Sequence, residues 1–196
     1  MHQDHDDFFA RAPEVVAPEL LGARLLVDGC GGDIVETEAY ALGDEASHSF
    51  RGQTKSNAAM FGPPGTAYVY RSYGLHWCLN IVCELGSAVL IRALHPIDGL
   101  DVMAARRRIS DPRLFCRGPG NLCQALNVTI ALNGLLVTQP PFLISLAAAH
   151  PEIAAGSRIG ITKGRDRKWR FVIPGSPYLS RPLRPPTPIG SSSVKG

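Results

Sequence analysis

The sequence predicts a single domain of the α+β class, with a largely antiparallel sheet and helices at its periphery. Its length of 196 residues fits one domain better than two. Hydrophobic residues make up 45% of the chain and charged residues 19%, so most of it is expected to fold around a core. Strand-like segments outnumber helical ones. The clearest pair, at 67–72 and 75–83, meets at Ser72-Tyr73-Gly74, which is typical of a hairpin turn.

In the first half of the chain, glycines and prolines separate the predicted elements. They are an acidic lead-in over 1–17 with a short helix around Phe8 and Phe9, a helical turn that closes at Gly22, and strands at 24–27 and 33–40 joined by the Gly-rich turn 29–32. The polar segment 41–66 then follows. It is too long for an idle connector in a compact domain, and loops of that length are often functional.

In the second half, alternation is the main signal. Within 75–83 it places Trp77, Leu79, Ile81 and Cys83 on the core side and His76, Cys78, Asn80 and Val82 on the other. The remaining predicted elements are a strand at 87–94 that contains Arg92, a helix at 98–108 that ends in three arginines, a helical turn at 121–126, and closing strands at 156–163 and 168–174. The tail 181–196 is rich in proline and serine and is expected to be disordered, which leaves 18–180 as the domain.

The charges are distributed unevenly. Residues 1–45 contain eleven Asp or Glu and two Arg, whereas residues 46–196 contain eighteen Lys or Arg and six acids. Sixteen of the twenty basic residues are arginines, whose rigid donor fork suits phosphates. A basic body indicates either a polyanion-binding face or arginines scattered over a solvated surface, and charge alone does not choose between them.

Several classes of protein are not indicated. No stretch approaches 18 uninterrupted apolar residues, and the first ten residues do not form a secretion signal. We therefore expect a soluble intracellular protein without a membrane partner. The five cysteines form no C-x-x-C pair, so they are interpreted as small buried side chains in a reducing compartment. No phosphate-binding loop, zinc-protease motif or nucleophile elbow is found, and we expect neither a metal site nor a cofactor.

The segment 34–40 is unusual for a strand, because alternation puts Glu36, Glu38 and Tyr40 on one face. Carboxylates are depleted in strands and costly to bury unpaired. One interpretation is an edge strand with a solvated face. The other is a carboxylate that acts as a general base, with its neighbour held by an arginine.

The tyrosines form the second unusual pattern. Tyr68 and Tyr70 share a strand face, which fits either ordinary packing or two flat rings presented to a base. Tyr73 at the hairpin turn is either a chance exposed aromatic or a wedge that unstacks DNA.

Taken together, the motifs resemble the alkyladenine (3-methyladenine, N-methylpurine) DNA glycosylase family. They occur in the family's order from about Pro18 to Ser180: ETEAY at 36–40, DEASHS at 44–49, MFGPPGTAYVY at 60–70, SYG at 72–74, LNI at 79–81, LIRAL at 90–94, GPGNLCQAL at 118–126, RIGI at 158–161 and GSPYLS at 175–180. Several motifs in the right order are far more specific than any one alone.

The resemblance implies a curved antiparallel sheet with a protruding β-hairpin, in a monomer without metal or cofactor. It implies a base-excision enzyme that acts on double-stranded DNA containing damaged purines. Such an enzyme flips out a 3-methyladenine-like base, or hypoxanthine or etheno-adenine, and hydrolyses its N-glycosidic bond with an activated water. The expected location is the cytoplasm or nucleoid of a bacterium, or the nucleus of a eukaryote.

The resemblance also implies roles for single residues. Glu38 matches the general base, Arg92 the arginine that helps hold the water, and the Ile159 carbonyl a further water contact. Tyr40 and His48 match the residues on one side of the extruded base, with the His48 N–H at its edge, and Tyr70 matches the residue on the other side. Tyr73 matches the tyrosine that fills the vacated gap, and Asn80 the residue that discourages guanine. Arg51 and Arg71 are candidates for phosphate contacts.

No lysine lies in the motifs expected to form the pocket, and Lys55 is only in the adjacent loop. Because a lyase that works through a Schiff base needs an amine, we expect a monofunctional glycosylase. A non-catalytic nucleic-acid-binding module remains an alternative, although such a protein has no use for a buried carboxylate facing a polyanion. A sugar glycosidase that uses Glu36 and Glu38 is less favoured, since residues two apart on a strand point the same way.

Overall fold

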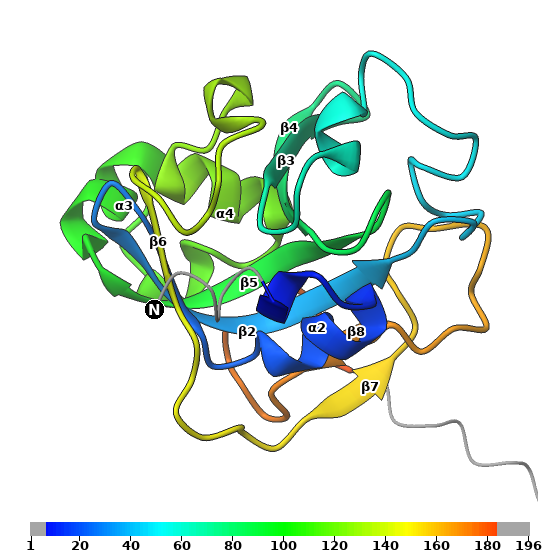
Figure 1. Ribbon diagram of the computed structural model, residues 1–196. Helices are drawn as coiled ribbons and strands as arrows, with labels where there is room; N and C mark the ends of the chain where they lie inside the picture. The colour runs from blue at the N-terminus through cyan, green and yellow to red at the C-terminus, as the bar shows by residue number, and fades with distance from the viewer. Residues whose placement is uncertain (1–6, 184–196) are drawn as a thin grey trace, which may run out of the picture.

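The structure is a computed structural model that describes residues 7–183. Its core is a sheet of eight strands that curls into a half-barrel, in the main order β3-β4-β5-β2-β1-β6 (Figure 1). The strands are β1 (Arg24–Val27), β2 (Cys30–Tyr40), β3 (Ala67–Ser72), β4 (His76–Val82), β5 (Ala88–Asp98), β6 (Phe142–Ser145), β7 (Ala154–Gly156) and β8 (Arg170–Val172). All their pairings are antiparallel, which confirms the α+β prediction.

β2 is the central strand of the sheet. It pairs along one edge with β5, and along the other with β1 at its beginning and with β8 at residues 36–38. The turn that starts it needs only Asp28 and Gly29, both with positive φ, as a two-residue hairpin requires. The prediction of an edge strand with a solvated face is therefore wrong. Glu36 and Glu38 are both fully buried, because neighbouring strands cover both edges of β2 and the folded chain covers its faces.

The pairing of β2 with β5 is interrupted next to Glu36. Glu36 lies opposite Ala93 and Thr37 opposite Ile91, so Arg92 is an extra residue on β5. Such bulges bend a strand and re-aim a side chain, and they are common next to active sites. Here the bulge places an arginine beside the two carboxylates of β2.

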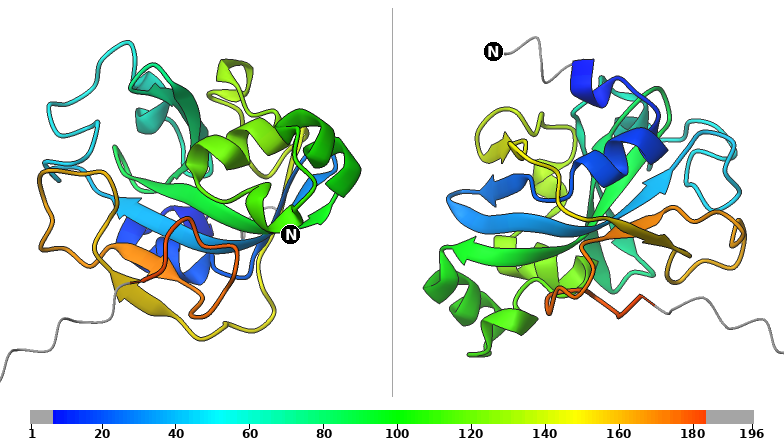
Figure 2. Two further views of the ribbon diagram at one scale, coloured as in Figure 1. Left: turned by 180° about the vertical axis from the view of Figure 1, so that it is seen from behind. Right: turned by 90° about the horizontal axis from the view of Figure 1, so that it is seen from below.

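Three helices cover the sheet: α2 (Pro13–Glu19), α3 (Leu100–Arg107) and α4 (Pro119–Leu126). Figures 1 and 2 show α2 lying across β2 and β8, where the Thr37 hydroxyl donates a hydrogen bond to the Ala17 carbonyl. α4 contacts α3, β4 and β5. The main core reaches further toward the N-terminus than the predicted boundary at Pro18, because Phe9 and Val16 are fully buried within it.

The predicted hairpin is present and protrudes. Residues 76–82 form β4, and their alternation is as expected, with Leu79 and Ile81 in the core and Trp77 packed against it. The turn residues Tyr73 and Gly74 both have positive φ. The Tyr73 side chain is 85% exposed, so its ring extends beyond the sheet.

Some predictions for the second half differ from the structure. Residues 157–163 form a loop, and only Ala154–Gly156 pairs as β7 with β8. β6 pairs with β1 but was not predicted, because its four residues lie in an apolar run next to two prolines. Residues 181–183 are part of the folded chain, since Leu183 packs against the cluster of Val35, Ala93, Val172 and Leu179. The rest of the tail predicted to be disordered, 184–196, lies outside the described residues.

The five cysteines are free and buried, which confirms their interpretation as small core side chains. Within residues 7–183, no helix has the length and apolar character needed to cross a membrane.

We predict that Gly32→Ala destabilises the protein by about 3 kcal/mol or more, measured by urea unfolding. A Cβ at Gly32 would lie 1.9 Å from the His95 carbonyl oxygen of β5, and backbone atoms cannot yield as a flexible side chain can. The matched control is Gly29→Asn in the same hairpin. No atom lies within 4 Å of its Cβ position, and asparagine tolerates the left-handed conformation, so a change within about 0.5 kcal/mol is expected. Equal effects of the two substitutions would contradict this account of the β2–β5 contact.

Candidate active site

A row of side chains across four strands forms the floor of a cavity. The register pairs Tyr68 with Asn80, Asn80 with Leu90, and Leu90 with Glu38. Residues opposite one another in a sheet share a face, so this row follows from the pairing alone. Tyr68, Asn80 and Leu90 line the cavity, whereas Glu38, which ends the row on β2, is fully buried and does not line it.

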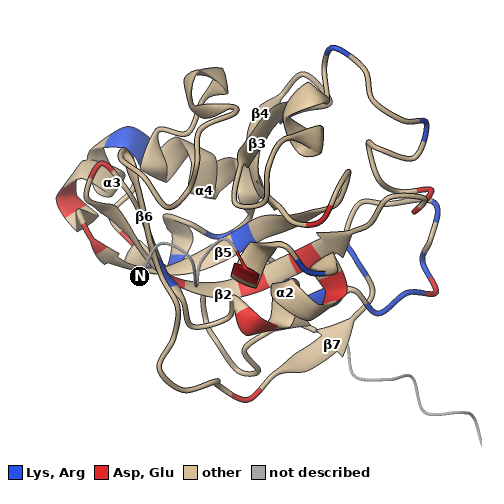
Figure 3. Ribbon diagram, viewed as in Figure 1, with Lys and Arg blue, Asp and Glu red and all other residues tan. Residues whose placement is uncertain are grey.

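Two long loops form the opposite wall. The segment after β2 contributes Glu45, Ala46 and His48, and the segment after β7 contributes residues 159–163. Figures 1 and 2 show these loops close together at the end of β2, and Figure 3 shows Lys and Arg on both. The cavity has a volume of about 640 Å³, within the range of about 300–1,000 Å³ that is usual for small-molecule sites.

Glu38 is fully buried and accepts hydrogen bonds from two sides. The Ile159 N–H donates to Oε1 at 2.7 Å and the Tyr40 hydroxyl to Oε2 at 2.7 Å. Arg92 Nη1 lies 3.3 Å from Oε2. Burial raises the pKa of Glu38 above its ordinary value, although Arg92 and the two hydrogen bonds act in the opposite direction. A buried carboxylate with a raised pKa, in contact with residues that line a cavity, is suited to accepting a proton.

Glu36 is placed differently, although it is on the same face of β2. Arg92 Nε lies 2.9 Å and Arg170 Nε 2.8 Å from its Oε1. Burial acts to raise the pKa of Glu36, but the two arginines lower it below its ordinary value. Both oxygens of the Glu36 carboxylate accept hydrogen bonds from arginine or serine groups, and its pKa is lowered, so Glu36 is poorly suited to accepting a proton. That excludes the carboxylate-pair arrangement of a sugar glycosidase.

Aromatic side chains line the upper cavity. His48 Nδ1 is hydrogen-bonded to the Tyr68 hydroxyl at 2.9 Å, and the His48 and Tyr70 ring centroids are 4.3 Å apart. The rings of Tyr68 and Tyr70 are stacked, with an interplanar angle of 28°. Burial raises the pKa of Tyr68 to about 12 and lowers that of His48. At neutral pH these rings are therefore uncharged, which suits them to stacking on a flat ligand.

His48 is positioned by its own loop. The Asn57 side-chain amide donates to the carbonyls of His48 and Gly52, at 2.9 and 3.1 Å. Asn57 is itself buried. One amide thus closes the loop that carries His48, so this part of the predicted 41–66 loop is ordered by its own hydrogen bonds.

Tyr40 has a cation on one side. The Arg158 guanidinium lies 4.7 Å from the Tyr40 ring centroid and forms a buried ion pair with Asp44. Arg158 also donates to the Ala39 carbonyl at 2.9 Å. Tyr40 lines the cavity whereas Arg158 does not, so the guanidinium supports the ring from behind. Arg158 directly precedes Ile159, and the same ion pair therefore anchors the backbone that donates to Glu38.

The structure thus brings Tyr40, His48, Tyr70, Asn80, Arg92 and Ile159 together around one cavity, next to Glu38. Asn80 is held from across the hairpin, because its side-chain amide donates to the Tyr68 carbonyl at 2.9 Å. The prediction for Ile159 concerns its carbonyl and a water; the contact that the structure shows is that of its N–H with Glu38. Tyr73 lies at the rim.

The two phosphate candidates are placed differently. Arg71 lines both the main cavity and an adjoining cleft of about 790 Å³, whereas Arg51 lines only the cleft. Arg71 lies over the Trp77 ring, 5.7 Å from its centroid.

Sequence reasoning missed several residues of the site. Asp44 and Arg158 stand in quoted motifs, but nothing in their spacing indicates that they pair across 114 residues. Lys163, which lies just outside the quoted motif at 158–161, also lines the cavity, in an ion pair with Glu45 at 3.6 Å. Across residues 7–183, no group of three or more His, Cys, Asp or Glu side chains is arranged to hold a metal ion.

Comparison with known proteins agrees with this geometry. Residues 7–177 match the family model described as methylpurine-DNA glycosylase. The chain belongs to the methylpurine-DNA glycosylase family. It is 60% identical over 179 residues to a protein of Rhodopseudomonas palustris strain BisB18, an alignment that covers 90% of each chain. It is 52% identical over 189 residues to one of Nitrosospira multiformis, covering 95% of this chain and 97% of the relative. Both relatives are named as candidate 3-methyladenine DNA glycosylases.

Membership of this family makes the protein a DNA N-glycosylase, an enzyme of DNA repair whose substrate is DNA. The alternative of a non-catalytic binding module is thereby set aside. The resemblance noted from the motifs is confirmed.

We predict that Asp44→Asn destabilises the protein by about 3–5 kcal/mol, because it leaves the Arg158 charge buried without its partner. The side chains of Asp44 and Arg158 are only 1% and 0% exposed, so solvent cannot replace the lost carboxylate. Urea unfolding measures the change. Asp111→Asn is the control, since its pair with Arg113 is at the surface and its loss should leave the unfolding midpoint unchanged. Similar midpoints for the two variants would show that the Asp44 pair is not structurally important.

Proposed function

We propose that the protein is a monofunctional, monomeric glycosylase that flips alkylated or deaminated purines out of double-stranded DNA. It hydrolyses the N-glycosidic bond of 3-methyladenine-like bases, and of hypoxanthine or etheno-adenine, with a water activated by Glu38. The observation that carries the proposal is the buried Glu38 carboxylate beside a cavity walled by uncharged aromatic rings. The names of the relatives support the choice of 3-methyladenine.

Binding begins with extrusion of the base, because a base inside a duplex cannot reach the floor of the cavity. Flipping costs a few kcal/mol in lost stacking and pairing. Tyr73, exposed at the tip of the hairpin, offsets part of this cost by filling the gap in the duplex. Within the cavity, Tyr40 and His48 contact one side of the base and Tyr70 the other, which requires the His48 and Tyr70 rings, with centroids 4.3 Å apart in the free protein, to separate. Each aromatic contact of this kind contributes about 1–3 kcal/mol.

For alkylated purines, the charge of the base favours binding. Alkylation at N3 or N7 makes a purine cationic, and tyrosine faces attract cations. Asn80 disfavours guanine, because its side-chain amide, fixed by the Tyr68 carbonyl, crowds the 2-amino group.

The chemical step uses one carboxylate. The C1′–N bond breaks as its electron pair moves to the base. An alkylated purine is thereby neutralised, whereas hypoxanthine or etheno-adenine leaves as an anion and takes a proton from solvent. The water oxygen bonds to C1′ from the opposite side while Glu38 accepts its proton, so the configuration at C1′ inverts. Arg92 and the Ile159 carbonyl hold the water near Glu38, and the Ile159 N–H is bonded to Glu38 itself. The products are a free base and an abasic site.

The deciding experiment is single-turnover base release from methylated duplex DNA and from a deoxyinosine duplex. Glu38→Gln should slow release by about 10²–10⁴-fold, because it cannot accept the proton of water. Binding to the duplexes should persist. Alkali reveals abasic sites, and borohydride should trap no covalent adduct, even though Lys163 lies at the cavity. Undiminished release by Glu38→Gln would refute the role of Glu38, and a trapped adduct would refute monofunctional chemistry.

The pH dependence follows from the same group. Glu38 acts only when deprotonated, so activity is present above its pKa and is lost as the pH falls through it. Burial raises that pKa, so the acid limb of the single-turnover rate should lie above pH 4.5, the ordinary value for a glutamate carboxyl. A limb at or below pH 4.5 would contradict the assignment. Release that is independent of pH would do so as well.

The DNA contacts can be separated by their salt dependence. Arg51→Ala and Arg71→Ala should each reduce the slope of log K against log salt by about 1, if each arginine binds one phosphate. Tyr73→Ala should weaken binding and base release but leave the slope unchanged, because an uncharged ring releases no counterions. The measurement is fluorescence anisotropy with a lesion-containing duplex over a range of salt concentrations. An unchanged slope in the arginine variants would remove them from the phosphate-binding surface.

A further inference from the structure

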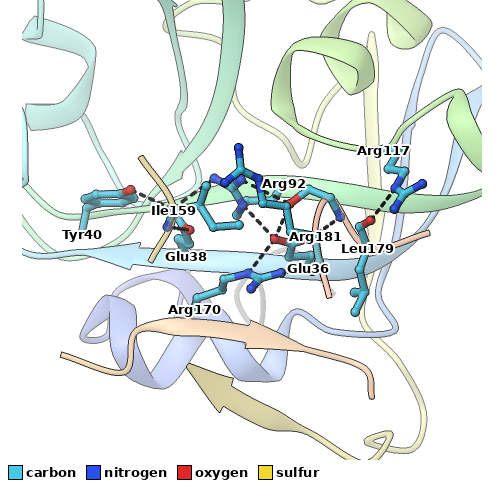
Figure 4. Close-up of polar contacts among 10 residues, drawn as sticks. Glu36, Glu38, Tyr40, Arg92, Arg117, Ile159, Arg170, Leu179 and Arg181 are labelled. Atoms are coloured by element: carbon cyan, nitrogen blue, oxygen red, sulfur yellow. Dashed lines mark hydrogen bonds and ion pairs between the residues drawn. The ribbon is translucent and has the colours of Figure 1, made fainter. Parts of the chain in front are cut away.

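Glu36 is the most densely bonded carboxylate near the site. It is fully buried, and its Oε1 accepts hydrogen bonds from Arg92 Nε, Arg170 Nε and the Ser180 hydroxyl. Its Oε2 accepts one from the Ser180 N–H at 2.6 Å. Figure 4 shows Arg92 and Arg170 reaching Glu36 from the two strands that flank β2. Glu36 does not line the cavity, and its hydrogen bonds are to Arg92, Arg170 and Ser180, so its effect on the site passes through these residues.

The Arg92 guanidinium is shared among three partners. Nε donates to Glu36 at 2.9 Å and Nη2 to the Ser180 hydroxyl at 3.2 Å, whereas Nη1 lies 3.3 Å from Glu38. The contacts with Glu36 and Ser180 are hydrogen bonds, whereas the contact with Glu38 is an ion pair without hydrogen-bond geometry. The orientation of Arg92 is therefore set by Glu36 and Ser180, and its approach to Glu38 is a consequence.

Arg170 balances the charges of this cluster. Glu36 and Glu38 are two buried carboxylates on one strand face, and Arg92 contacts both. Arg170 forms an ion pair with Glu36. With Arg170 present, two guanidiniums balance the two carboxylates. Arg170 compensates part of the Glu36 charge, so Arg92 can also form an ion pair with Glu38. Without Arg170, Arg92 alone would have to compensate both anions.

The C-terminal segment 175–181 closes the cluster. Besides Ser180, its Leu179 carbonyl accepts a hydrogen bond from Arg117 Nε at 2.9 Å. The Arg181 carbonyl accepts one from Arg170. Arg170 thus joins the segment to Glu36, and all these contacts are drawn in Figure 4.

We propose that Glu36, Arg170 and Ser180 are positioning residues that fix the guanidinium of Arg92 against Glu38. The chemical step then depends on the C-terminal segment being docked, although that segment does not line the cavity. This inference rests on the proposed function only for the roles of Glu38 and Arg92.

The first test compares two variants with opposite expected effects on the acid limb of single-turnover base release. The titratable and charged groups around Glu38 are Glu36 and Tyr40 on β2, Arg92 on β5, and Tyr70 and Cys78 on the hairpin strands. Glu36→Gln removes a neighbouring anion, so the acid limb should move to lower pH by about one unit, while base release slows because Arg92 has lost the carboxylate that holds it. Arg170→Gln removes a cation and draws Arg92 toward Glu36. Glu38 then loses part of its compensating charge, so the acid limb of the rate should move to higher pH by a similar amount. Loss of packing alone would not produce shifts of opposite sign.

The second test uses a milder change, because either of those variants could fail to fold. Ser180→Ala should slow base release from methylated duplex DNA about tenfold or more, since it removes the hydroxyl that orients Arg92. Ser180→Thr keeps the hydroxyl and should restore the rate. Duplex binding should be the same in both variants. The matched control is Asp98→Asn, which disrupts the Arg24 cluster at the other end of β2 and β5 and should change neither rate nor limb.

The outcomes separate this inference from the proposed function. Base release that survives in Glu38→Gln defeats the proposed role of Glu38 itself. If Glu38→Gln is inactive but the acid limb stays in place in folded Glu36→Gln and Arg170→Gln, the positioning role is overturned. Equal rates for Ser180→Ala and Ser180→Thr also overturn it, and that comparison decides alone if neither charge variant folds.

Discussion

The burial of two carboxylates on the central strand is the constraint on which the site depends. Removing ionised groups from water is costly unless charge partners and hydrogen bonds compensate. Glu36 is compensated on both edges of β2 by Arg92 and Arg170. The charge of Glu38 is compensated less, by one ion pair with Arg92 and by hydrogen bonds from Tyr40 and Ile159. The difference leaves one carboxylate firmly ionised and the other with a raised pKa. Glu36 and Glu38, two positions apart on one face of β2, therefore differ in how readily they accept a proton.

The rest of the architecture serves this arrangement. The bulge on β5 aims Arg92 at the pair, and the sheet register aligns Asn80 and Leu90 with Glu38. The loops are held by buried polar groups of their own, Asn57 in one case and the Asp44–Arg158 pair in the other. Preorganised side chains lose little freedom when a ligand binds, which is how a rigid scaffold supports affinity.

Local features of the structure could be predicted from the sequence, whereas long-range ones could not. The hairpin of β3 and β4 was predicted because its turn residues and alternation lie within one short segment. The burial of Glu36 was not, because a period of two is the same for a central strand and an edge strand. Residues 157–163 were mistaken for a strand because Ile159 and Ile161 alternate with small residues. The grouping of Glu38 with Arg92, and the roles assigned to both, came from the family resemblance, since spacing alone does not bring β2 and β5 together.

The distance in sequence between Glu36 and Ser180 has a consequence for how the enzyme matures. The two residues are 144 positions apart, and Arg170 is 134 positions from the same carboxylate. During synthesis on the ribosome, nearly the whole domain emerges before Glu36 can meet these partners. Contacts of such high sequence separation form late and slow folding. The cluster around Glu36 therefore cannot be complete until Ser180 has left the ribosome, and a nascent chain with only its β2–β5 pairing lacks two of the partners of this carboxylate.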